Sequence, residues 1–516
     1  MLCQRFAADL RLLTPASVEE VLGPAAAAAW RRELPAAALR VLRRERDPVA
    51  VLTRLLVLGD PTPARLVAQA LPRTTLAGAV RLGVVAVSTS PGAADQGEVR
   101  PLVHLRPHLS PDGVWWLACD LGEHATGAAL APEHVLGVGG ASATLAHWTP
   151  RRPVRRALDL GTGCGIQAFH AARHADHVVA TDVSARALAF TAFNAALNAA
   201  ADGGPFEGRR LDLRQGSLLA PVAHERGQFD LVVSNPPFVI TPRAPDVPLL
   251  EYRDGGLAGD DVVRRLVTEV GDLLAPGGIA QVIGNWEHRT GPGQDWRSRV
   301  RSWLPAHCQA WVVQRDVQDP VSYAETWARD GGRRVGDPEH DLLLERWLDD
   351  FAAREVTGVG FGIITLRRPR SGPTGVATHR LDDLRTASLG ADAAGMGPVV
   401  LAVLDAEQWL ARTSDAELLA ARLVVAADVT EERHGLPGAD EPQRILLRQT
   451  GGLQRVVQVE TALAALVGAC DGELAVGQVL GALAQLLDEP AAPLAARLLP
   501  DVRRLVGDLL LQVPAG

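Results

Sequence analysis

The middle of the chain consists of short apolar runs that alternate with amphipathic segments. Between residues 155 and 368 the runs are bounded by Gly, Pro or Asp, as buried parallel strands are. The intervening segments have the period of helices, notably 165–175 and 185–199. This order predicts an α/β fold, a doubly wound, Rossmann-like sheet of seven strands at 157–160, 177–181, 209–215, 229–234, 278–284, 309–314 and 358–367. Residues 317–354 form an insertion before the last strand, with a helix in its second half.

The pattern differs on both sides of this core. Residues 1–135 begin with short amphipathic helices opened by Asp and Pro, and end with two alternating strands, 99–107 and 113–121. Helices followed by a strand pair are the winged-helix order. Such a unit reads DNA or docks on another surface, and its Leu, Val and Ala content favours docking on the substrate side.

Residues 367–375 are rich in Arg, Pro and Gly and indicate a linker. After the linker, a hairpin around Gly451 and Gly452 precedes three helical runs. We therefore predict three domains: a helical, winged-helix-like domain at 1–135, the α/β domain at 136–370, and a small, mostly helical, winged-helix-like domain at 376–516.

Composition restricts the class of protein more than it restricts the function. The 516 residues carry 52 basic and 60 acidic side chains, a net charge of −8, which gives no general attraction to nucleic acid. Every basic residue is arginine. The arginine runs at 40–46 and 151–156 could contact phosphates, but with the net charge of −8 they are expected to be solvated helix faces. No apolar run is long enough to span a membrane, and no signal peptide is expected at the start.

The five cysteines are scattered and form no C-x-x-C pair, which indicates a reducing, cytoplasmic location. His104, His108, Cys119 and His124 have a spacing that fits no standard metal site, so no metal is predicted.

The first chemical signal is "ALDLGTGCG", an apolar strand that leads into Asp159 and a glycine loop. Gly161, Gly163 and Gly165 let a ligand approach the backbone at a helix start. A dinucleotide-binding loop requires a small residue where this chain has a bulky isoleucine. The next strand ends at Asp182, where a carboxylate can accept both hydroxyls of a ribose. Together these features indicate an adenosine ligand without a pyrophosphate.

The second signal is "FDLVVSNPPF", which ends the fourth strand at the same edge of the sheet. Pro236 and Pro237 fix Asn235, so that its side-chain carbonyl and the carbonyl of Pro236 face the crevice. Two fixed acceptors can hold the hydrogens of a planar –NH2 group, and Phe238 can stack on the plane of that group. The alternative is an ordinary turn in which Asn caps the backbone.

"DLGTGCG", "ATDVS" and "SNPPF" together resemble the class I S-adenosylmethionine-dependent methyltransferases, in the amino-methylating branch with an (N/D)PP(Y/F) motif. That branch includes the small-domain ribosomal RNA guanine methyltransferases and the release-factor glutamine methyltransferases. The upstream segment "VLGVGGASATLAHWTPRR" resembles the part of such enzymes that folds over the cofactor. A serine-hydrolase loop around Ser142 is the alternative, but its second glycine is absent.

The resemblance implies a site for S-adenosyl-L-methionine and a site for the acceptor nitrogen. Cofactor contacts are implied for Asp159, Gly161, Thr162, Gly163, Gly165, Asp182, Ser217, Leu218 and Asn235. Catalytic roles are implied for Asn235, Pro236, Pro237 and Phe238, with Tyr252, Asp254 and Trp286 on the substrate side. A sulfonium methyl is already activated, so positioning matters more than a general base.

Three acceptors share this chemistry: a base amine of RNA, a base amine of DNA and a glutamine amide of a protein. An exocyclic amine of ribosomal or transfer RNA leads our expectation, and the glutamine amide follows. A pseudoenzyme that binds the cofactor and assists RNA or ribosome assembly is the alternative of another class; the intact Asn235 and glycine loop argue against it. The sequence does not specify the oligomeric state.

Overall fold

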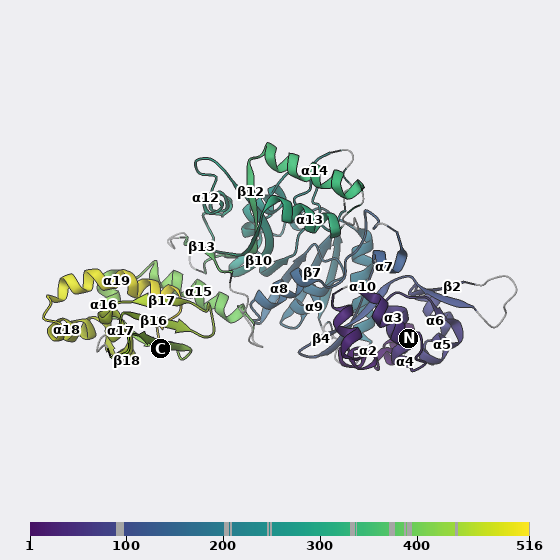
Figure 1. The fold of residues 1–516 in the computed structure, drawn as a ribbon, viewed down its shortest axis with the longest axis horizontal. Helices are drawn as coiled ribbons and strands as arrows, with labels where there is room; N and C mark the ends of the chain where they lie inside the picture. The colour runs from purple at the N-terminus through teal and green to yellow at the C-terminus, as the bar shows by residue number, and fades with distance from the viewer. Residues whose placement is uncertain are drawn as a thin grey trace.

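The computed structural model arranges the chain in a central α/β part flanked by two smaller units (Figure 1). The structure describes residues 1–32, 34–88, 97–128, 130–200, 206, 209–244, 247, 250–330, 336, 338–370, 377–385, 389, 395–438 and 442–514. No helix in these ranges is both long and apolar enough to cross a membrane.

The central sheet has eight strands in the order β13-β11-β12-β10-β9-β6-β7-β8. The five strands β10, β9, β6, β7 and β8 are parallel, each paired with the next. β12 is antiparallel to both of its neighbours, β10 and β11. The doubly wound α/β fold is therefore confirmed. The strands are β6 (Val154–Leu160), β7 (Ala175–Asp182), β8 (Arg210–Gln215), β9 (Phe229–Ser234), β10 (Leu274–Arg289), β11 (Gln309–Gln318), β12 (Val356–Arg367) and β13 (His379–Asp383).

Helices cover both faces of this sheet. One face packs against α9 through alanine and valine side chains, and the other packs against α11 and α12 through larger apolar residues. α13 and α14 belong to the predicted insertion and cover the far ends of β11 and β12. The helices are α8 (Gly140–Trp148), α9 (Ile166–Ala172), α10 (Ala185–Ala199), η2 (Ala220–Val222), α11 (Asp261–Val270), η3 (Gly271–Leu273), α12 (Trp296–Trp303), α13 (Pro320–Asp330) and α14 (Pro338–Ala353).

The direction in which successive strands are added to the sheet reverses between β6 and β9. Strands β6, β7 and β8 extend the sheet one way, and β9 and β10 extend it the other way. Ligands of open α/β sheets bind beyond the carboxyl ends of the strands at such a switch point. The two sequence motifs follow β6 and β9, so both lie at this point.

The N-terminal unit (residues 1–135) was predicted to be winged-helix-like. Its helices α4, α5 and α6 and its three-stranded sheet β1-β3-β2 follow one another in the order α4, β1, α5, α6, β2, β3. The predicted hairpin around Ser110 and Gly113 is present as β4–β5, but its first strand begins at His104 because β3 ends at Pro101, and the hairpin packs on α10 apart from this sheet. The elements are α1 (Leu2–Leu10), α2 (Pro15–Trp30), α3 (Pro35–Leu42), α4 (Pro48–Leu52), η1 (Thr53–Val57), β1 (Thr62–Pro63), α5 (Ala64–Ala70), α6 (Leu76–Arg81), β2 (Val85–Ser88), β3 (Glu98–Pro101), β4 (His104–Ser110), β5 (Gly113–Cys119) and α7 (Glu123–Thr126).

The N-terminal unit shares its core with the central part. Ala187, Phe190 and Leu197 of α10 belong to the same apolar cluster as the N-terminal helices. Within the unit, α1 lies against α6: the buried carboxylate of Asp9 accepts the backbone N–H groups of Arg73 and Thr74, which precede α6. The interior of this unit is thus continuous with the fold that carries the site.

The C-terminal unit (residues 376–516) was predicted to be small, mostly helical and winged-helix-like. After α17 come β18, α18, α19 and β19. The sheet order β18-β14-β19 places the earliest strand in the middle, whereas β1-β3-β2 has its last strand there. The elements are α15 (Gly397–Leu410), α16 (Asp415–Ala420), β14 (Arg422–Val425), β15 (Val429–His434), β16 (Arg444–Gln449), β17 (Val456–Val459), α17 (Thr461–Gly468), β18 (Asp471–Ala475), α18 (Val476–Leu486), α19 (Ala491–Gly507) and β19 (Leu511–Gln512).

The eighth strand of the central sheet was not expected. β13 follows the predicted boundary at 376 but pairs in parallel with β11, and Asp382 on β13 accepts a hydrogen bond of 2.8 Å from Trp311 Nε1. Residues 371–376 of the predicted linker lie outside the described residues. The division into 1–135, 136–370 and 376–516 stays a prediction.

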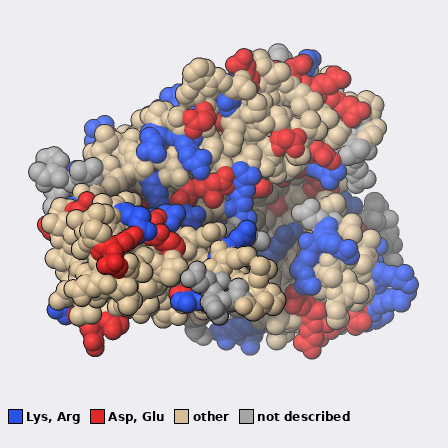
Figure 2. Space-filling view, turned by 60° about the vertical axis from the view of Figure 1, so that its left-hand side comes forward, with Lys and Arg blue, Asp and Glu red and all other residues tan. Residues whose placement is uncertain are grey.

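Charge is mixed over the face of the molecule shown in Figure 2. Acidic and basic side chains lie next to one another on the face shown, and basic side chains gather at its right-hand end. Arginines of the C-terminal unit are often paired, as Arg497 is with Glu460 and Glu489.

Candidate functional site

A cleft of about 360 Å³ opens at the switch point of the sheet. Its walls come from six segments: 133–137, 160–164, 181–184, 216–218, 235–237 and 251–256. The glycine loop, the end of β7 and the NPP motif therefore meet in one cavity, as the two motifs predicted.

The glycine loop is shaped by side chains that do not line the cleft. Asp159 is fully buried, and its carboxylate accepts hydrogen bonds from Thr162 Oγ1 at 2.7 Å and from the N–H of Ala168 at 2.9 Å. Burial raises the pKa of Asp159 to about 7. Gly165 begins α9 with φ of 92°, and a Cβ there would stand 3.0 Å from Thr191. Asp159 and Gly165 thus hold the loop, whereas Gly161, Thr162 and Gly163 line the cleft.

Asp182 connects the glycine loop to the next turn. One carboxylate oxygen accepts the N–H of Gly163 and the other that of Ser184, both at 2.9 Å. Burial raises the pKa of Asp182. Each carboxylate oxygen can accept a second hydrogen bond, so the group remains able to bind a ligand diol at the cavity wall.

An apolar slot adjoins Asp182. Val183, which is 52% exposed, and Leu218 both line the cleft, together with Ser217. Leu218 has φ of 46°, a left-handed conformation that a leucine rarely adopts. Sequence reasoning missed Val183; the signal was its place directly after the acidic end of β7.

Asn235 presents an unpaired acceptor at the cleft. Its Nδ2 lies 3.4 Å from Oγ of Ser142 on α8, and its Oδ1 is buried without a hydrogen-bond partner among the described residues. Gln167 Nε2 donates to the backbone carbonyl of Ser142 at 2.7 Å, which fixes the start of α8. The segment predicted to fold over the cofactor therefore lies at the wall of the cleft and orients the Asn235 amide.

Phe238 does not line the cleft, contrary to its predicted stacking role. Its ring packs edge-on to Trp327, with 6.3 Å between ring centroids, in the core of the insertion. Pro236 and Pro237, in contrast, are part of the cleft wall. The aromatic position of the motif therefore anchors the loop in this chain.

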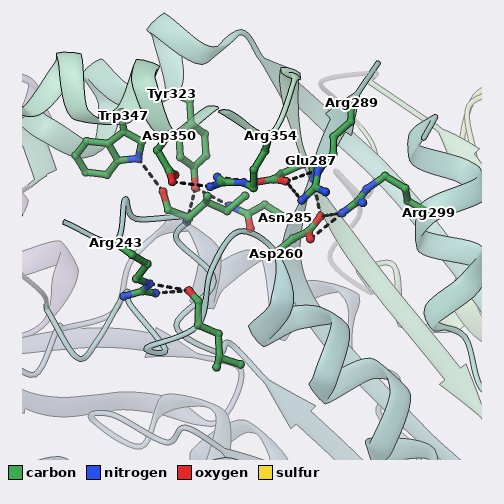
Figure 3. Close-up of polar contacts among 12 residues, drawn as sticks. Arg243, Asp260, Asn285, Glu287, Arg289, Arg299, Tyr323, Trp347, Asp350 and Arg354 are labelled. Carbon is green, nitrogen blue, oxygen red and sulfur yellow. Dashed lines mark hydrogen bonds and ion pairs between the residues drawn. The ribbon is translucent and has the colours of Figure 1, made fainter. Parts of the chain in front are cut away.

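The chain that leaves the motif is fixed by the insertion (Figure 3). The N–H of Ile240 donates to the hydroxyl of Tyr323 at 2.9 Å, and its carbonyl accepts from Trp347 Nε1 at 2.7 Å. Asn285 Nδ2 donates to the same Tyr323 hydroxyl at 2.8 Å. All of these contacts are buried, so both polar groups of Ile240 are held by α13 and α14.

The hydrogen bonds from α13 and α14 to Ile240 form a clamp on the chain after the motif. Buried ion pairs lie next to this clamp (Figure 3). The carboxylate of Glu287 is fully buried and faces the guanidinium groups of Arg289 and Arg354. Asp260 pairs with Arg299 at 2.7 Å and accepts the N–H of Glu287 at 2.9 Å. These pairs fix the loop that ends at α11, and residues 254–256 of this loop line the cleft.

The predicted substrate-side residues have different positions. Tyr252 lines the cleft and donates from its hydroxyl to Asp330 at 2.7 Å; burial, with the charge of Asp330, raises its pKa. Asp254 also lines the cleft, but its carboxylate pairs with Arg243 at 2.6 Å. Trp286 was wrongly assigned: it is fully buried, stacks on Trp296 and donates to Gln314 at 2.9 Å.

Three family models match the chain. Residues 137–291 match the methyltransferase small domain, and residues 13–96 and 401–511 match two domains of unknown function (DUF7059 and DUF7782). Together with the doubly wound sheet and the cleft, this match shows that the central part of the chain is a class I methyltransferase small domain.

Curated relatives resemble about a quarter to a third of the chain. A ribosomal protein uL3 glutamine methyltransferase of Bradyrhizobium diazoefficiens is 35% identical over 30% of this chain and 48% of its own length. A release factor glutamine methyltransferase of Deinococcus radiodurans is 39% identical, over 35% and 59%. A ribosomal RNA small subunit methyltransferase C of Alcanivorax borkumensis is 30% identical, over 26% and 33%. The chain thus spans between a third and three fifths of these relatives.

Solved structures overlap less closely. A geranyl diphosphate C-methyltransferase from Streptomyces coelicolor A3(2) is 14% identical, over 44% of this chain and 78% of that chain, with a TM-score of 0.27. A likeness of this size carries no argument about function.

Proposed function

We propose that this protein is an S-adenosylmethionine-dependent methyltransferase that acts on a planar amide or amino nitrogen. The observation that carries the proposal is the buried, unpaired Oδ1 of Asn235 at the wall of the cleft. A buried acceptor without a donor is unfavourable, and an –NH2 group of a substrate would supply the missing donor.

The remaining walls fit S-adenosylmethionine. Asp182 can accept the ribose hydroxyls, Val183 and Leu218 offer apolar contacts to the adenine, and the glycine loop leaves room for the methionine part. The lining residues include four carboxylates and no arginine, which suits a ligand that carries a positive sulfonium. When bound, the cofactor supplies a methyl group that is already activated for transfer.

Asn235 has one chemical task in this scheme. Its carbonyl oxygen accepts an N–H of the substrate and directs the nitrogen lone pair toward the methyl group. Nδ2 of Asn235 lies 3.4 Å from Oγ of Ser142, which leaves Oδ1 as the atom of the amide that lacks a partner among the described residues. Because the nitrogen can lose its proton after the methyl group has arrived, the site needs no strong base.

The charge at the mouth of the cleft favours a glutamine side-chain amide of a protein as the acceptor. Glu133 and Glu251 line the cleft and are exposed to solvent, and the N–H of Glu251 donates to the carbonyl of Pro132 at 2.9 Å. Two carboxylates at the entrance repel a phosphate backbone and tolerate a neutral or basic polypeptide.

A base amine of ribosomal or transfer RNA is the second candidate. Exposed arginines of the N-terminal unit have no ion pair among the described residues and could hold phosphates outside the cleft. These arginines are Arg40, Arg44, Arg46, Arg65, Arg73, Arg81 and Arg100. A cytoplasmic location remains a prediction for either acceptor.

Replacement of Asn235 tests the proposed chemistry. Asn235→Ala is expected to leave the affinity for S-adenosylhomocysteine nearly unchanged and to lower turnover about a hundredfold to a thousandfold, as loss of one fixed polar contact does. Calorimetry measures the first quantity, and methyl transfer from labelled S-adenosylmethionine into cell lysate measures the second. A variant that transfers methyl at the unmodified rate would remove the catalytic role of the motif.

The labelled product separates the acceptors. If protease releases the methyl label from the macromolecular fraction and nuclease does not, the glutamine amide is supported. If nuclease releases the label and protease does not, RNA is supported. Asn235→Asp adds a second criterion: retained activity indicates a base amine, and near-total loss indicates the amide. Cofactor binding without label in either fraction would support the pseudoenzyme alternative.

A further inference from the structure

Helix α10 carries two buried asparagines, one turn apart, that bind the edge of strand β5. Asn194 accepts the N–H of Ala118 at 2.8 Å and donates to its carbonyl at 3.0 Å. Asn198 makes the same pair of bonds with Trp116, at 2.9 and 2.8 Å. The two amides thus complete the hydrogen bonds of β5 as a neighbouring strand would.

Asn194 makes one bond that Asn198 does not make. Its second Nδ2 hydrogen points to the carbonyl of Cys164, at 2.8 Å, in the glycine loop that lines the cleft. The corresponding hydrogen of Asn198 is used within the helix, on the carbonyl of Asn194 at 2.9 Å. Both side chains are almost fully buried, so neither bond is shared with water.

A third side chain of α10 supports the same loop. Thr191 Oγ1 donates to the carbonyl of Gly163 at 3.0 Å. α10 therefore holds two successive carbonyls of the loop on the side away from the cleft. Asn194 is the residue that joins this loop to β5 of the N-terminal unit.

Strand β5 also supports the rim of the cleft. It leads into Asp120, whose carboxylate accepts the N–H of Val135 at 2.9 Å and whose own N–H donates to the Val135 carbonyl at 3.1 Å. Val135 is part of the cleft wall. A displacement of β5 would reach the cleft both through Asn194 and through the rim.

We propose that Asn194 is a positioning residue that couples the cofactor loop to the N-terminal unit. Through Asn194, docking of β5 on α10 sets the loop in its cofactor-binding form, and cofactor binding in turn stabilises β5. Coupling between two sites is reciprocal, so both directions must be observed. The inference rests on the proposed cofactor.

The pair of asparagines provides a matched comparison in the full-length protein. Asn194→Ala is expected to weaken S-adenosylhomocysteine binding about tenfold or more, because the loop carbonyl loses its donor. Asn198→Ala removes the equivalent pair of hydrogen bonds with β5, those to Trp116, but no bond with the loop. It is expected to change the affinity by less than about threefold. Calorimetry measures both. If Asn194→Ala fails to fold, Asn194→Asp keeps the acceptor for Ala118 and removes the Nδ2 donor to the carbonyls of both Ala118 and Cys164, at the cost of a buried carboxyl group.

Hydrogen exchange tests the opposite direction. In the unmodified protein and in Asn198→Ala, saturating S-adenosylhomocysteine is expected to slow exchange of the Ala118 amide, and this slowing should be absent in Asn194→Asp. Equal affinities for all variants, or equal losses for the two asparagines, would overturn the coupling alone. Failure of the unmodified protein to bind S-adenosylhomocysteine would overturn the proposed cofactor, and the coupling with it.

Discussion

Residues of the site could be assigned from the sequence where the direction of the side chain follows from its place at the end of a strand. The glycine loop, Asp182 and Asn235 each directly follow a buried strand, and the ends of parallel strands meet at one edge of a sheet. Trp286 lies within β10, a strand of 16 residues, and turns into the core instead. Phe238 follows its strand but faces the insertion, whose position the sequence does not specify.

Asp159 provides a test at this scale. Its pKa of about 7 in the folded protein lies above the ordinary 3.8, so the folded state binds this proton more tightly than the unfolded state. The contribution to stability is fully present below about pH 4 and is lost as the pH rises through 7. Asp159→Asn, which keeps an acceptor for Thr162 and Ala168, should flatten this dependence.

The measurement is chemical unfolding of the unliganded protein between pH 4 and pH 8. The free energy of unfolding of the unmodified protein should fall relative to the Asn variant by about 2–4 kcal/mol, since one pKa unit corresponds to about 1.4 kcal/mol. Parallel curves for the two proteins would show that Asp159 does not titrate in this range.

At the scale of elements, the strands of the central sheet were predicted well because buried parallel strands are continuous apolar runs. The first strand of the N-terminal hairpin was predicted to begin too early because Val99, Pro101, Val103 and Leu105 alternate without a visible break. The chain nevertheless ends β3 at Pro101 and begins β4 at His104. Strand pairing depends on partners distant in sequence, which local alternation does not contain.

The clamp on Ile240 is tested by Tyr323→Phe. Loss of the hydroxyl leaves the N–H of Ile240 and the Nδ2 of Asn285 buried without this acceptor, which should cost about 1–3 kcal/mol for each group. Because Ile240 follows the NPPF motif closely, turnover should fall while the affinity for S-adenosylhomocysteine is retained.

The matched control is Tyr252→Phe, which removes the only other tyrosine hydroxyl of the chain. That hydroxyl bonds to Asp330, which is partly exposed, so the loss in stability should be smaller, below about 1 kcal/mol. Equal unfolding free energies for the two variants would contradict the clamp.

At the scale of the whole molecule, the C-terminal unit is attached more firmly than a linker suggests. Met396, Val400 and Leu404 pack with Trp311 and Ile363 of the central sheet. The nearly buried Arg367 of β12 donates to the carbonyl of Leu404 and pairs with Asp405. Neither contact can be inferred from the Pro- and Gly-rich segment that separates the two parts in the sequence.

Two truncations test this attachment. A chain that ends at 372 would lack β13 and α15, expose the edge of β11 and remove the partners of Arg367 at Leu404 and Asp405, so it should aggregate or unfold at a lower temperature. A chain that ends at 412 keeps both elements and should remain folded and bind S-adenosylhomocysteine. Thermal unfolding compares them; a stable chain ending at 372 would show that the linker separates independent domains.

Both terminal units carry an extra helix: α1 lies against α6 in the N-terminal unit, and α15 packs on α19 in the C-terminal unit. In the predicted winged helix of the N-terminal unit, α6 is the third helix. In regulators of transcription, this helix of the motif enters the major groove of DNA. Here the carboxylate of Asp9 accepts the backbone N–H groups of Arg73 and Thr74 ahead of α6, so these amides are already bonded within the chain. An anion that approaches this end of α6 would have to displace Asp9 before it could reach them.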